Sequence, residues 1–264
     1  WGVVHDGIHP NFPTVEGLKR HRAAGGLVIL VSNSPRTAKG VARQLAEIGV
    51  DPASHDGIVT SGDVTRDLML QEGGGKVYHL GPSRDLSIFE GLAVSRVALK
   101  EARAVVCTGL VDDLSETPAD YAGVLKEMRE RGLVMICANP DRLVKNGKRT
   151  LFCAGALADS YAALGGRVLM AGKPYRPIYD RAMAMAGGLA ATGVKSGNVL
   201  AIGDGPATDM RGAADYGLAA LLVADGLTEA ANGLAATALE VKTAIPGLEL
   251  VGAVHSLAWN GKDG

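Results

Sequence analysis

The sequence predicts an α/β fold built on a parallel sheet. Short runs of apolar, often β-branched residues alternate along the chain with stretches whose apolar residues recur at helical spacing. This alternation is typical of strand–helix–strand units. Glycine makes up 36 of the 264 residues and aromatic residues only 4%, so we expect many tight turns and a core of Ala, Val and Leu. The length allows one large domain or two smaller ones.

The first part of the chain contains two strand–helix pairs. Leu27–Val31 is an unbroken apolar run of strand length, and the apolar residues of Thr37–Ile48 have the spacing of a helix that packs one face. Ile58–Thr60 and Asp63–Gln71 repeat the pattern. Gly73–Gly75 then interrupts it, so we place a candidate domain boundary there.

The rest of the chain continues the alternation. The expected strands are Lys76–Leu80, Ala104–Thr108, Val134–Ala138, Arg167–Gly172, Val199–Ile202 and Ala220–Val223, and the expected helices are Pro118–Arg131, Pro177–Gly187 and one that starts at Thr208. Strands lie on both sides of the middle segment. The pattern therefore fits an insertion within a parallel-sheet domain as well as two consecutive domains.

Charge, hydropathy and cysteine content exclude several classes of protein. The net charge is −1 and the pI is about 6.7, which gives no overall positive field for nucleic acid or a membrane surface. No apolar run has the ~18 residues of a membrane span. Cys107, Cys137 and Cys153 form no CxxC pair, so we expect reduced core residues rather than zinc ligands or a disulfide set. With no export signal visible, we expect a cytoplasmic location.

Polar residues directly follow three of the expected strands, and ligands of open parallel sheets bind at such strand ends. Ser32 and Asn33 come between a strand and a helix, so the Ser32 hydroxyl and free backbone N–H groups could hold a phosphate. A plain helix cap explains the same residues. Lys173, within Gly-Lys-Pro after another apolar run, could neutralise a phosphate. The alternative is a surface lysine before a turn.

The third such place is the sequence GDGPATD, which follows the strand Val199–Ile202. Asp204 and Asp209 offer one carboxylate at the strand end and one at a helix start, and Mg²⁺ prefers such hard oxygen ligands. A turn with Asp as a helix cap is the alternative. Because the third glycine of GxGxxG is missing and no GxxxxGK[ST] occurs, a dinucleotide-binding oxidoreductase and a P-loop protein are disfavoured.

Taken in order, these three motifs resemble those of the haloacid dehalogenase-like (HAD) superfamily. The similarity is closest to its class IIA, the NagD-like and 4-nitrophenylphosphatase-like phosphatases. Trp1–Gly7 (WGVVHDG) is similar to the end of the first family motif, and Ala138–Asp141 (ANPD) is similar to a substrate loop of the family's cap domain. The resemblance covers nearly the whole chain.

The resemblance implies a doubly wound parallel-sheet, Rossmann-like core formed by residues 1–73 and 167–264, with an α/β cap inserted at 74–166. It also implies roles for particular residues. Lys173, Ser32 and Asp204 would be catalytic groups, and Ser32, Asn33 and Lys173 would bind the phosphate. The Mg²⁺ ligands would be Asp204, Asp209 and the backbone carbonyl of Trp1. Asn139 and Asp141 would contact the substrate from the cap loop.

The first motif departs from the family pattern. Family members use Asp-x-Asp, in which the first Asp attacks phosphorus and the second is the general acid and base. Trp1 stands at the second position, so the nucleophile is expected upstream of Trp1. Indole can neither protonate a leaving group nor activate water. His5 and Asp6 follow closely and are candidates to replace the missing group.

The leading interpretation is a Mg²⁺-dependent phosphatase that hydrolyses a small phosphorylated metabolite through an aspartyl-phosphate, slowly because of Trp1. The alternative is a catalytically weak or inactive phosphate- or nucleotide-binding regulatory protein of the same fold, which Trp1 favours. The resemblance also suggests a homodimer that forms through the cap. The sequence does not select the substrate.

Overall fold

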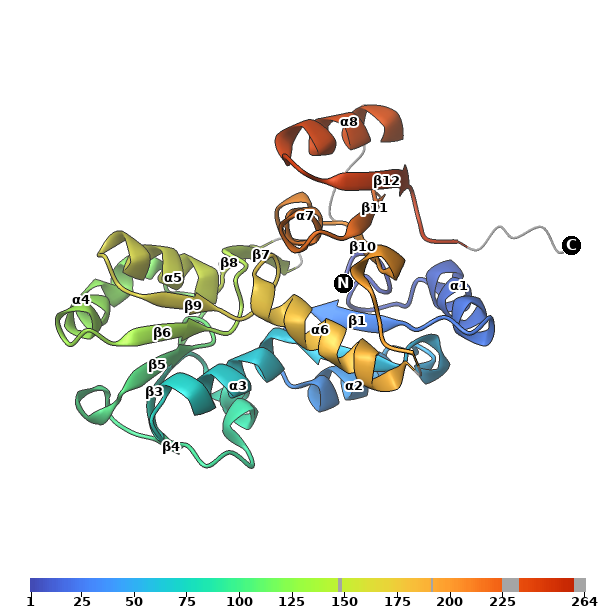
Figure 1. The fold of residues 1–264 in the computed structure, drawn as a ribbon. Helices are drawn as coiled ribbons and strands as arrows, with labels where there is room; N and C mark the ends of the chain where they lie inside the picture. The colour runs from blue at the N-terminus through green and yellow to red at the C-terminus, as the bar shows by residue number, and fades with distance from the viewer. Residues whose placement is uncertain (147–148, 191, 225–232, 259–264) are drawn as a thin grey trace, which may run out of the picture. The chain divides into compact units, whose positions relative to one another are not determined.

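The computed structural model describes residues 1–146, 149–190, 192–224 and 233–258. The chain divides into two compact units, of which unit 1 comprises Trp1–Val31, Ala42–Ile58 and Lys173–Gly264, and unit 2 comprises Ser32–Val41 and Val59–Gly172. Three elements run from one unit into the other, and they are β1 (Ile29–Ser32), α2 (Ala38–Glu47) and β2 (Gly57–Thr60) (Figure 1). The predicted core and cap boundaries, at 73/74 and 166/167, stay a prediction.

Unit 2 is built on a five-stranded sheet in the order β4-β3-β5-β6-β9, with every neighbouring pair parallel. The strands are β3 (Lys76–Leu80), β4 (Ser95–Arg96), β5 (Ala104–Cys107), β6 (Val134–Cys137) and β9 (Val168–Met170). Its helices are α3 (Ser61–Glu72), α4 (Ala122–Glu130) and α5 (Ala154–Ala163). An antiparallel hairpin of β7 (Leu143–Asn146) and β8 (Arg149–Phe152) stands apart from this sheet.

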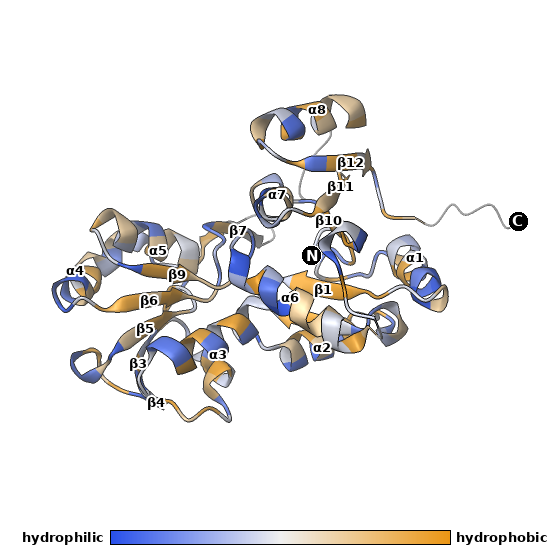
Figure 2. Cartoon of the chain, viewed as in Figure 1, coloured by the Kyte–Doolittle hydropathy of each residue, from blue (hydrophilic) through white to orange (hydrophobic). Residues whose placement is uncertain are grey.

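Helices cover both faces of the sheet in unit 2. Successive strand residues point to opposite faces, so Val105 and Met135 join one core with residues of α4 and α5, whereas Val106 and Ile136 join another with Met69 of α3. All five side chains are fully buried, and β6 and β9 are among the apolar strands in Figure 2. The predicted α/β fold with a parallel sheet is confirmed, although the sheet described here lies mainly in the segment that the resemblance assigned to the cap.

Unit 1 contains a second parallel sheet, in the order β10-β11-β12. The strands of this sheet are β10 (Leu200–Gly203), β11 (Ala219–Val223) and β12 (Glu249–Val254). The helices of unit 1 are α1 (Phe12–Ala23), α6 (Arg176–Leu189), α7 (Arg211–Tyr216) and α8 (Leu234–Ala244). Helix α7 packs against β11 and α8 against β12. β1 and β2 form a separate two-stranded sheet, so both β1 and β10 are edge strands among the described residues.

Several predicted elements need correction. Pro118–Tyr121 forms a 3-10 turn, so the predicted helix Pro118–Arg131 begins as an α-helix only at Ala122. The helix expected from Thr208 begins at Arg211, after a π-helical turn over Pro206–Met210 in which the Gly205 carbonyl accepts several backbone N–H groups. Elements that were not predicted are α1, α5, α8, β4, β7, β8 and β12.

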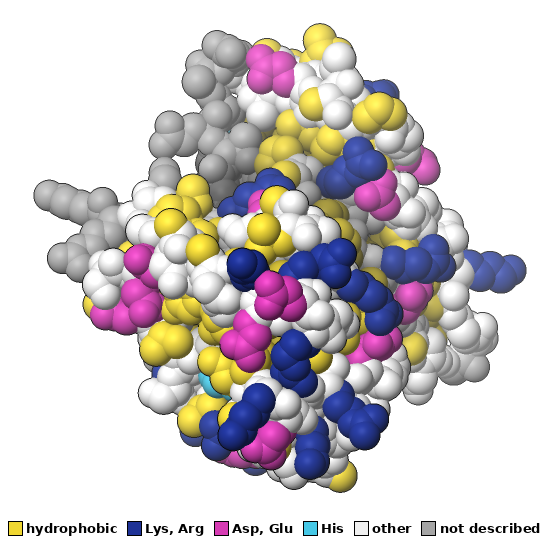
Figure 3. All heavy atoms as spheres, turned by 90° about the vertical axis from the view of Figure 1, so that its left-hand side faces the viewer, with side chains coloured by type: hydrophobic (Ala, Val, Ile, Leu, Met, Phe, Trp, Pro, Cys, Tyr) yellow, Lys and Arg dark blue, Asp and Glu magenta, His cyan; other side chains and the backbone are white. Residues whose placement is uncertain are grey.

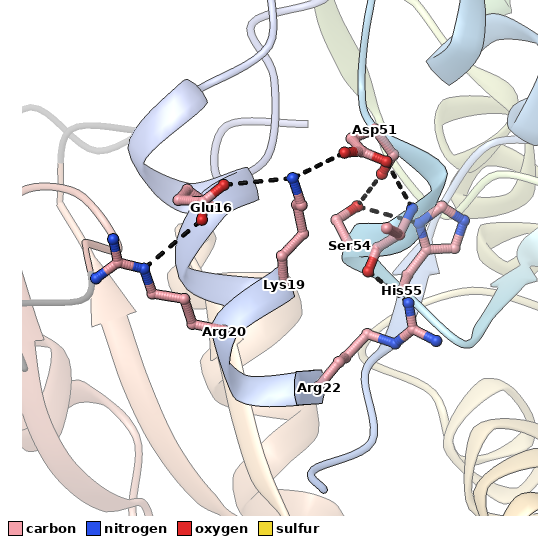
Figure 4. Close-up of polar contacts among 8 residues, drawn as sticks. Glu16, Lys19, Arg20, Arg22, Asp51, Ser54 and His55 are labelled. Atoms are coloured by element: carbon pink, nitrogen blue, oxygen red, sulfur yellow. Dashed lines mark hydrogen bonds and ion pairs between the residues drawn. The ribbon is translucent and has the colours of Figure 1, made fainter. Parts of the chain in front are cut away.

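Ion pairs attach α1 to the segment that precedes β2. Figure 4 shows Lys19 between Glu16 and Asp51, and Lys19 Nζ lies 2.9 Å from Asp51 Oδ2. Arg22 pairs with Asp56 at 2.6 Å, and the other oxygen of Asp56 accepts the Val28 backbone N–H at 2.8 Å. Asp56 therefore links the end of α1 to the residue before β1. The hydrogen bond from Arg22 holds the pKa of the Asp56 carboxyl below its usual value.

The surface of unit 2 on the side of α4 carries basic and acidic side chains interspersed with apolar ones (Figure 3). None of the described helices combines the length and the apolar character that crossing a bilayer requires. The three cysteines are buried and free, as expected for core residues.

Candidate active site

Lys173 and Asp209 form a largely buried ion pair in unit 1. Lys173 Nζ donates to Asp209 Oδ1 at 2.8 Å, and the two side chains are only 16% and 13% exposed. Lys173 lies just before α6, and Asp209 lies in the turn that follows β10. The fold therefore brings together two residues that are far apart in sequence, although the strands that precede them, β9 and β10, belong to different sheets.

The second oxygen of Asp209 is also held. Asp209 Oδ2 accepts from the Gly205 backbone N–H and from the Thr208 hydroxyl, each at 3.2 Å. A Cβ at Gly203 would lie 2.3 Å from the Asp209 side chain, so the end of β10 approaches this carboxylate as closely as only glycine allows. The Asp209 side chain consequently has one fixed orientation, toward Lys173.

Asp204 lies under the first residues of the chain. Its side chain is nearly inaccessible, with 4% of the residue exposed. A Cβ at Gly2 would lie 2.2 Å from Asp204 Oδ2, and Gly2 has a φ of 79°, which favours glycine. The Trp1 backbone nitrogen lies within electrostatic range of Lys173, Asp204 and Asp209. Unit 1 thus brings together all four of its predicted site residues.

The oxygen donors of this cluster fit a magnesium ion. Within the described residues, no group of three or more His, Cys, Asp or Glu side chains could hold a metal by itself. Asp204 and Asp209 supply two carboxylates, and Gly2 leaves the space that a larger side chain would fill against Asp204. Mg²⁺ usually takes one or two protein carboxylates and completes its shell with water and substrate oxygens. A backbone carbonyl at Trp1 is compatible with that set.

The other four predicted site residues belong to unit 2. Asn33 Nδ2 donates to Asp141 Oδ1 at 3.1 Å, and Asn139 Oδ1 accepts the Asp141 backbone N–H at 3.0 Å. Ser32 Oγ accepts the Ser34 backbone N–H at 3.2 Å. The turn after β1, which holds the predicted phosphate ligands Ser32 and Asn33, is therefore in direct contact with the ANPD loop after β6 within unit 2.

Asp6 and His5 differ in their fitness to replace the missing acid/base residue. Asp6 Oδ1 accepts the backbone N–H groups of His9 and Ile8 at 2.7 and 2.8 Å, and these bonds lower the pKa of Asp6 to about 2. A carboxyl so strongly held as its anion is a poor proton donor. Burial lowers the pKa of His5 to about 4, and its ring contacts Trp1 at a centroid distance of 5.6 Å.

Sequence reasoning missed three groups that shape this cluster. Thr208 and the Gly205 N–H orient Asp209, and Gly2 lies against Asp204. Thr208 directly precedes Asp209 and Gly205 directly follows Asp204. A hydroxyl residue next to a predicted metal ligand is a signal that it orients the ligating carboxylate, since such carboxylates are themselves hydrogen-bonded.

Comparisons with known proteins decide the family. A family model described as haloacid dehalogenase-like hydrolase matches residues 1–95, and one described as HAD-hydrolase-like matches residues 170–245. A hydrolase of the haloacid dehalogenase-like family from Brucella suis is 44% identical over 98% of this chain and 93% of its own, with a TM-score of 0.84. The chain belongs to the haloacid dehalogenase-like hydrolase family. This confirms the predicted membership of the HAD superfamily.

Other HAD structures share the fold at lower identity. A p-nitrophenyl phosphatase from Archaeoglobus fulgidus is 23% identical, with 97% of this chain and 94% of that one covered and a TM-score of 0.77. A glycerol phosphate phosphatase from Mycobacterium tuberculosis, in complex with magnesium, is 25% identical over 97% of this chain and 73% of that one, with a TM-score of 0.72. These neighbours share the fold of this chain over nearly its whole length. No protein with a curated description matches this HAD chain.

Proposed function

We propose that this HAD protein is a Mg²⁺-dependent phosphatase that acts on a small phosphorylated metabolite. The observation that carries the proposal is the buried Lys173–Asp209 pair, 2.8 Å long, beside the buried carboxylate of Asp204. A positive ammonium and two carboxylates suit a bound phosphoryl group with its cation. Structural neighbours named as phosphatases, one of them solved with magnesium, support the same reaction and cofactor.

In this proposal each site residue has a separate task. Lys173 neutralises the phosphoryl oxygens as a point charge, and the Ser32 hydroxyl with the Asn33 amide donates hydrogen bonds to them. Asp204, Asp209 and the Trp1 carbonyl hold Mg²⁺, which supplies positive charge where negative charge develops on the transferring phosphoryl group. Asp209 has a second task, because its contact with Lys173 fixes the position of the ammonium group.

The nucleophile in this proposal is an Asp upstream of Trp1. Its carboxylate attacks phosphorus, the ester oxygen departs, and water then hydrolyses the aspartyl-phosphate to release inorganic phosphate. The Trp1 nitrogen lies within electrostatic range of Lys173, Asp204 and Asp209, so a preceding residue would lie near this charged cluster. β1 and β10 have unpaired edges among the described residues with which a preceding strand could pair.

The substrate contacts of the proposal come from the ANPD loop. Asn139 and Asp141 lie beside Asn33 through the Asn33–Asp141 hydrogen bond of 3.1 Å, so groups assigned to the phosphate and to the rest of the substrate are adjacent in unit 2. We assign residues 74–166 to a cap that excludes bulk water and selects small substrates. A homodimer through this cap and a cytoplasmic location complete the proposal, the latter supported by three free cysteines.

The rate of this phosphatase should depend strongly on the acidity of the leaving group. Without a general acid at position 1, the ester oxygen departs unprotonated, and general acid–base help is worth roughly 10²–10⁴-fold. We expect kcat/KM to fall at least about tenfold from 4-nitrophenyl to 4-methoxyphenyl phosphate. Substituted phenyl phosphates keep the ring constant while the acidity of the phenol changes.

Trp1→Asp is the matched variant for this test. It restores a carboxyl at the acid/base position, so the dependence on leaving-group acidity should become shallower. A wild-type rate that does not change across the phenyl series would contradict the loss of acid catalysis at Trp1. Absence of hydrolysis for every ester would contradict the phosphatase proposal itself.

Two observations favour a second candidate, a phosphate-binding regulatory protein that has lost turnover. Trp1 occupies the acid/base position of the family, and Asp6 is held as an anion by backbone donors. A regulatory protein would bind phosphate and Mg²⁺ through the same residues without hydrolysing esters. Direct assay of phosphate release separates the two candidates.

A further inference from the structure

The strand order of unit 2 reverses between β3 and β5. The chain leaves β3 for β4 on one side and then returns to β5 on the other side, as the order β4-β3-β5 shows (Figure 1). The segments after the two strands also part. Ile88 and Phe89, after β3, join the core that contains Met69 of α3, whereas Leu110 and Tyr121, after β5, join the core that contains residues of α4 and α5. Ligands of open parallel sheets bind at such a reversal, beyond the carboxyl ends of the strands.

Three polar side chains form a chain of hydrogen bonds at this reversal. His79, one residue before the end of β3, has its Nε2 2.9 Å from the Oγ1 of Thr108, which directly follows β5. The Thr108 side chain also hydrogen-bonds the carboxyl of Asp85, which lies in the 3-10 helix Ser83–Phe89. Thr108 is only 5% exposed, and a Cβ at Gly81 would lie 2.1 Å from its hydroxyl oxygen. Glycine at position 81 therefore leaves the room that this chain of hydrogen bonds needs.

The direction of these hydrogen bonds follows from the hydrogens available. A threonine hydroxyl has one hydrogen, and an ionised carboxylate only accepts. Thr108 therefore donates to Asp85 and accepts from the Nε2–H of His79. Burial lowers the pKa of His79 to about 4, and the ring of Phe89 meets the His79 ring edge to face at a centroid distance of 5.3 Å. A neutral, supported His79 thus orients Thr108, and Thr108 orients Asp85.

The surroundings of Asp85 suit an uncharged hydrogen-bond donor. Burial raises the pKa of its carboxyl, because removing a carboxylate from water costs free energy unless donors replace the water. A carboxylate has about four acceptor positions, more than the Thr108 hydroxyl alone can fill. Arg84 and Arg36 lie within electrostatic range and already oppose its negative charge. Hydroxyl groups, rather than a further cation, are therefore the donors that fit.

The predicted phosphate ligands lie at the same edge of unit 2. Arg36, which is within electrostatic range of Asp85, comes three residues after Asn33. Asn33 in turn bonds to Asp141 in the loop after β6, and β6 is the neighbour of β5. A substrate whose phosphate binds at Ser32 and Asn33 can therefore extend its other end toward Asp85.

We propose that Asp85 accepts hydrogen bonds from hydroxyl groups of the substrate, so that this phosphatase selects phosphate esters of polyols or sugars. The inference rests on the proposed phosphatase function and names the substrate class of that site. Asp85 is the residue that determines specificity, and Thr108 and His79 are positioning residues that act through it. A site built to hydrogen-bond a substrate hydroxyl rejects the analogue that lacks it, because the buried polar groups of the site are then left unpaired.

The test compares phosphate esters of similar shape with and without hydroxyl groups. One pair is glycerol 3-phosphate and propyl phosphate, and the other is glucose 6-phosphate and cyclohexylmethyl phosphate. Each ester competes with 4-nitrophenyl phosphate for the protein as its gene encodes it, and the slowed release of nitrophenolate gives the inhibition constant. The ratio of the two constants within a pair measures what the hydroxyl groups contribute, even where the competing esters are hydrolysed slowly.

We expect the hydroxylated ester of at least one pair to inhibit the unmodified protein about tenfold more tightly than its partner. Asp85→Ala should remove most of this preference. Thr108→Val, which keeps the shape but not the hydroxyl, should weaken the preference, and Thr108→Ser should retain it. Asp113→Ala is the matched control, because Asp113 is a second carboxylate near Asp85 and pairs with Arg84, and it should keep the preference.

Three results would overturn the role of Asp85 while leaving the phosphatase function intact. They are equal inhibition within both pairs in the unmodified protein, a preference that persists in folded Asp85→Ala, and an equal loss of preference in Asp113→Ala. Failure of the unmodified protein to hydrolyse 4-nitrophenyl phosphate would instead overturn the function on which the inference rests.

Discussion

Replacement of Asp204 by Asn is expected to lower kcat/KM for 4-nitrophenyl phosphate by roughly 10³-fold or more. Asp204 is 4% exposed and lies against Gly2, so the amide of similar shape fits the same space without a negative charge. A neutral amide is a much weaker ligand for Mg²⁺ than a carboxylate. The bound cation and its stabilisation of the phosphoryl transfer would be lost together.

Two further measurements show whether Asp204→Asn acts through the metal. Binding of Mg²⁺ to the folded state raises the melting temperature, and this rise should be present in the unmodified protein and absent in Asp204→Asn. Asp215→Asn is a matched control, because Asp215 pairs with Arg211 on the exposed side of α7. Retention of both activity and the Mg²⁺-dependent rise in Asp204→Asn would refute the metal role of Asp204.

Lys173→Met is expected to reduce kcat/KM by roughly 10²–10³-fold, the usual loss when one stabilising group of a transition state is removed. Methionine has a similar length but no charge. The loss should appear mainly in kcat, since the ammonium stabilises negative charge that grows in the transition state. Asp209 keeps its bonds from Gly205 and Thr208, so we expect the turn itself to persist.

The matched control for Lys173→Met is Lys19→Met. Lys19 also forms ion pairs, with Asp51 and Glu16, but it lies on α1 and about one third of its side chain is exposed. Its loss should leave the kinetics unchanged, because exposed pairs contribute only about 0–1 kcal/mol to stability. An equal activity for the two variants, both folded by circular dichroism, would remove Lys173 from the proposed mechanism.

The central strands of the sheet in unit 2 were predictable because they are buried on both faces. β5 and β6 consist of apolar residues that are fully or almost fully inaccessible, and such runs stand out from a sequence alone. Helix α1 was missed because few of its residues are apolar, although Asn11 caps it through the Thr14 N–H at 3.2 Å. That cap, followed by a proline in the first turn, is the signal that could have found it.

The candidate site was predictable as a set of motifs but not as a geometry. Lys173, Asp204 and Asp209 lie beyond apolar runs, and this position was enough to expect them near strand ends. Lys173 pairs with Asp209 although β9 and β10 belong to different sheets. Contacts such as Thr208 on Asp209 or Gly7 beneath the Trp1 ring depend on the path of a turn. Local spacing does not determine that path, as the π-helical turn over Pro206–Met210 demonstrates.

The most direct test of the proposed function is phosphate release from 4-nitrophenyl phosphate by the protein as its gene encodes it, first with Mg²⁺, then with EDTA, and again after excess Mg²⁺. We expect slow but measurable release with Mg²⁺, loss of release with EDTA and recovery when the metal is restored. A folded protein that binds Mg²⁺ and inorganic phosphate yet releases no phosphate from the ester would contradict the phosphatase and establish the regulatory candidate in its place.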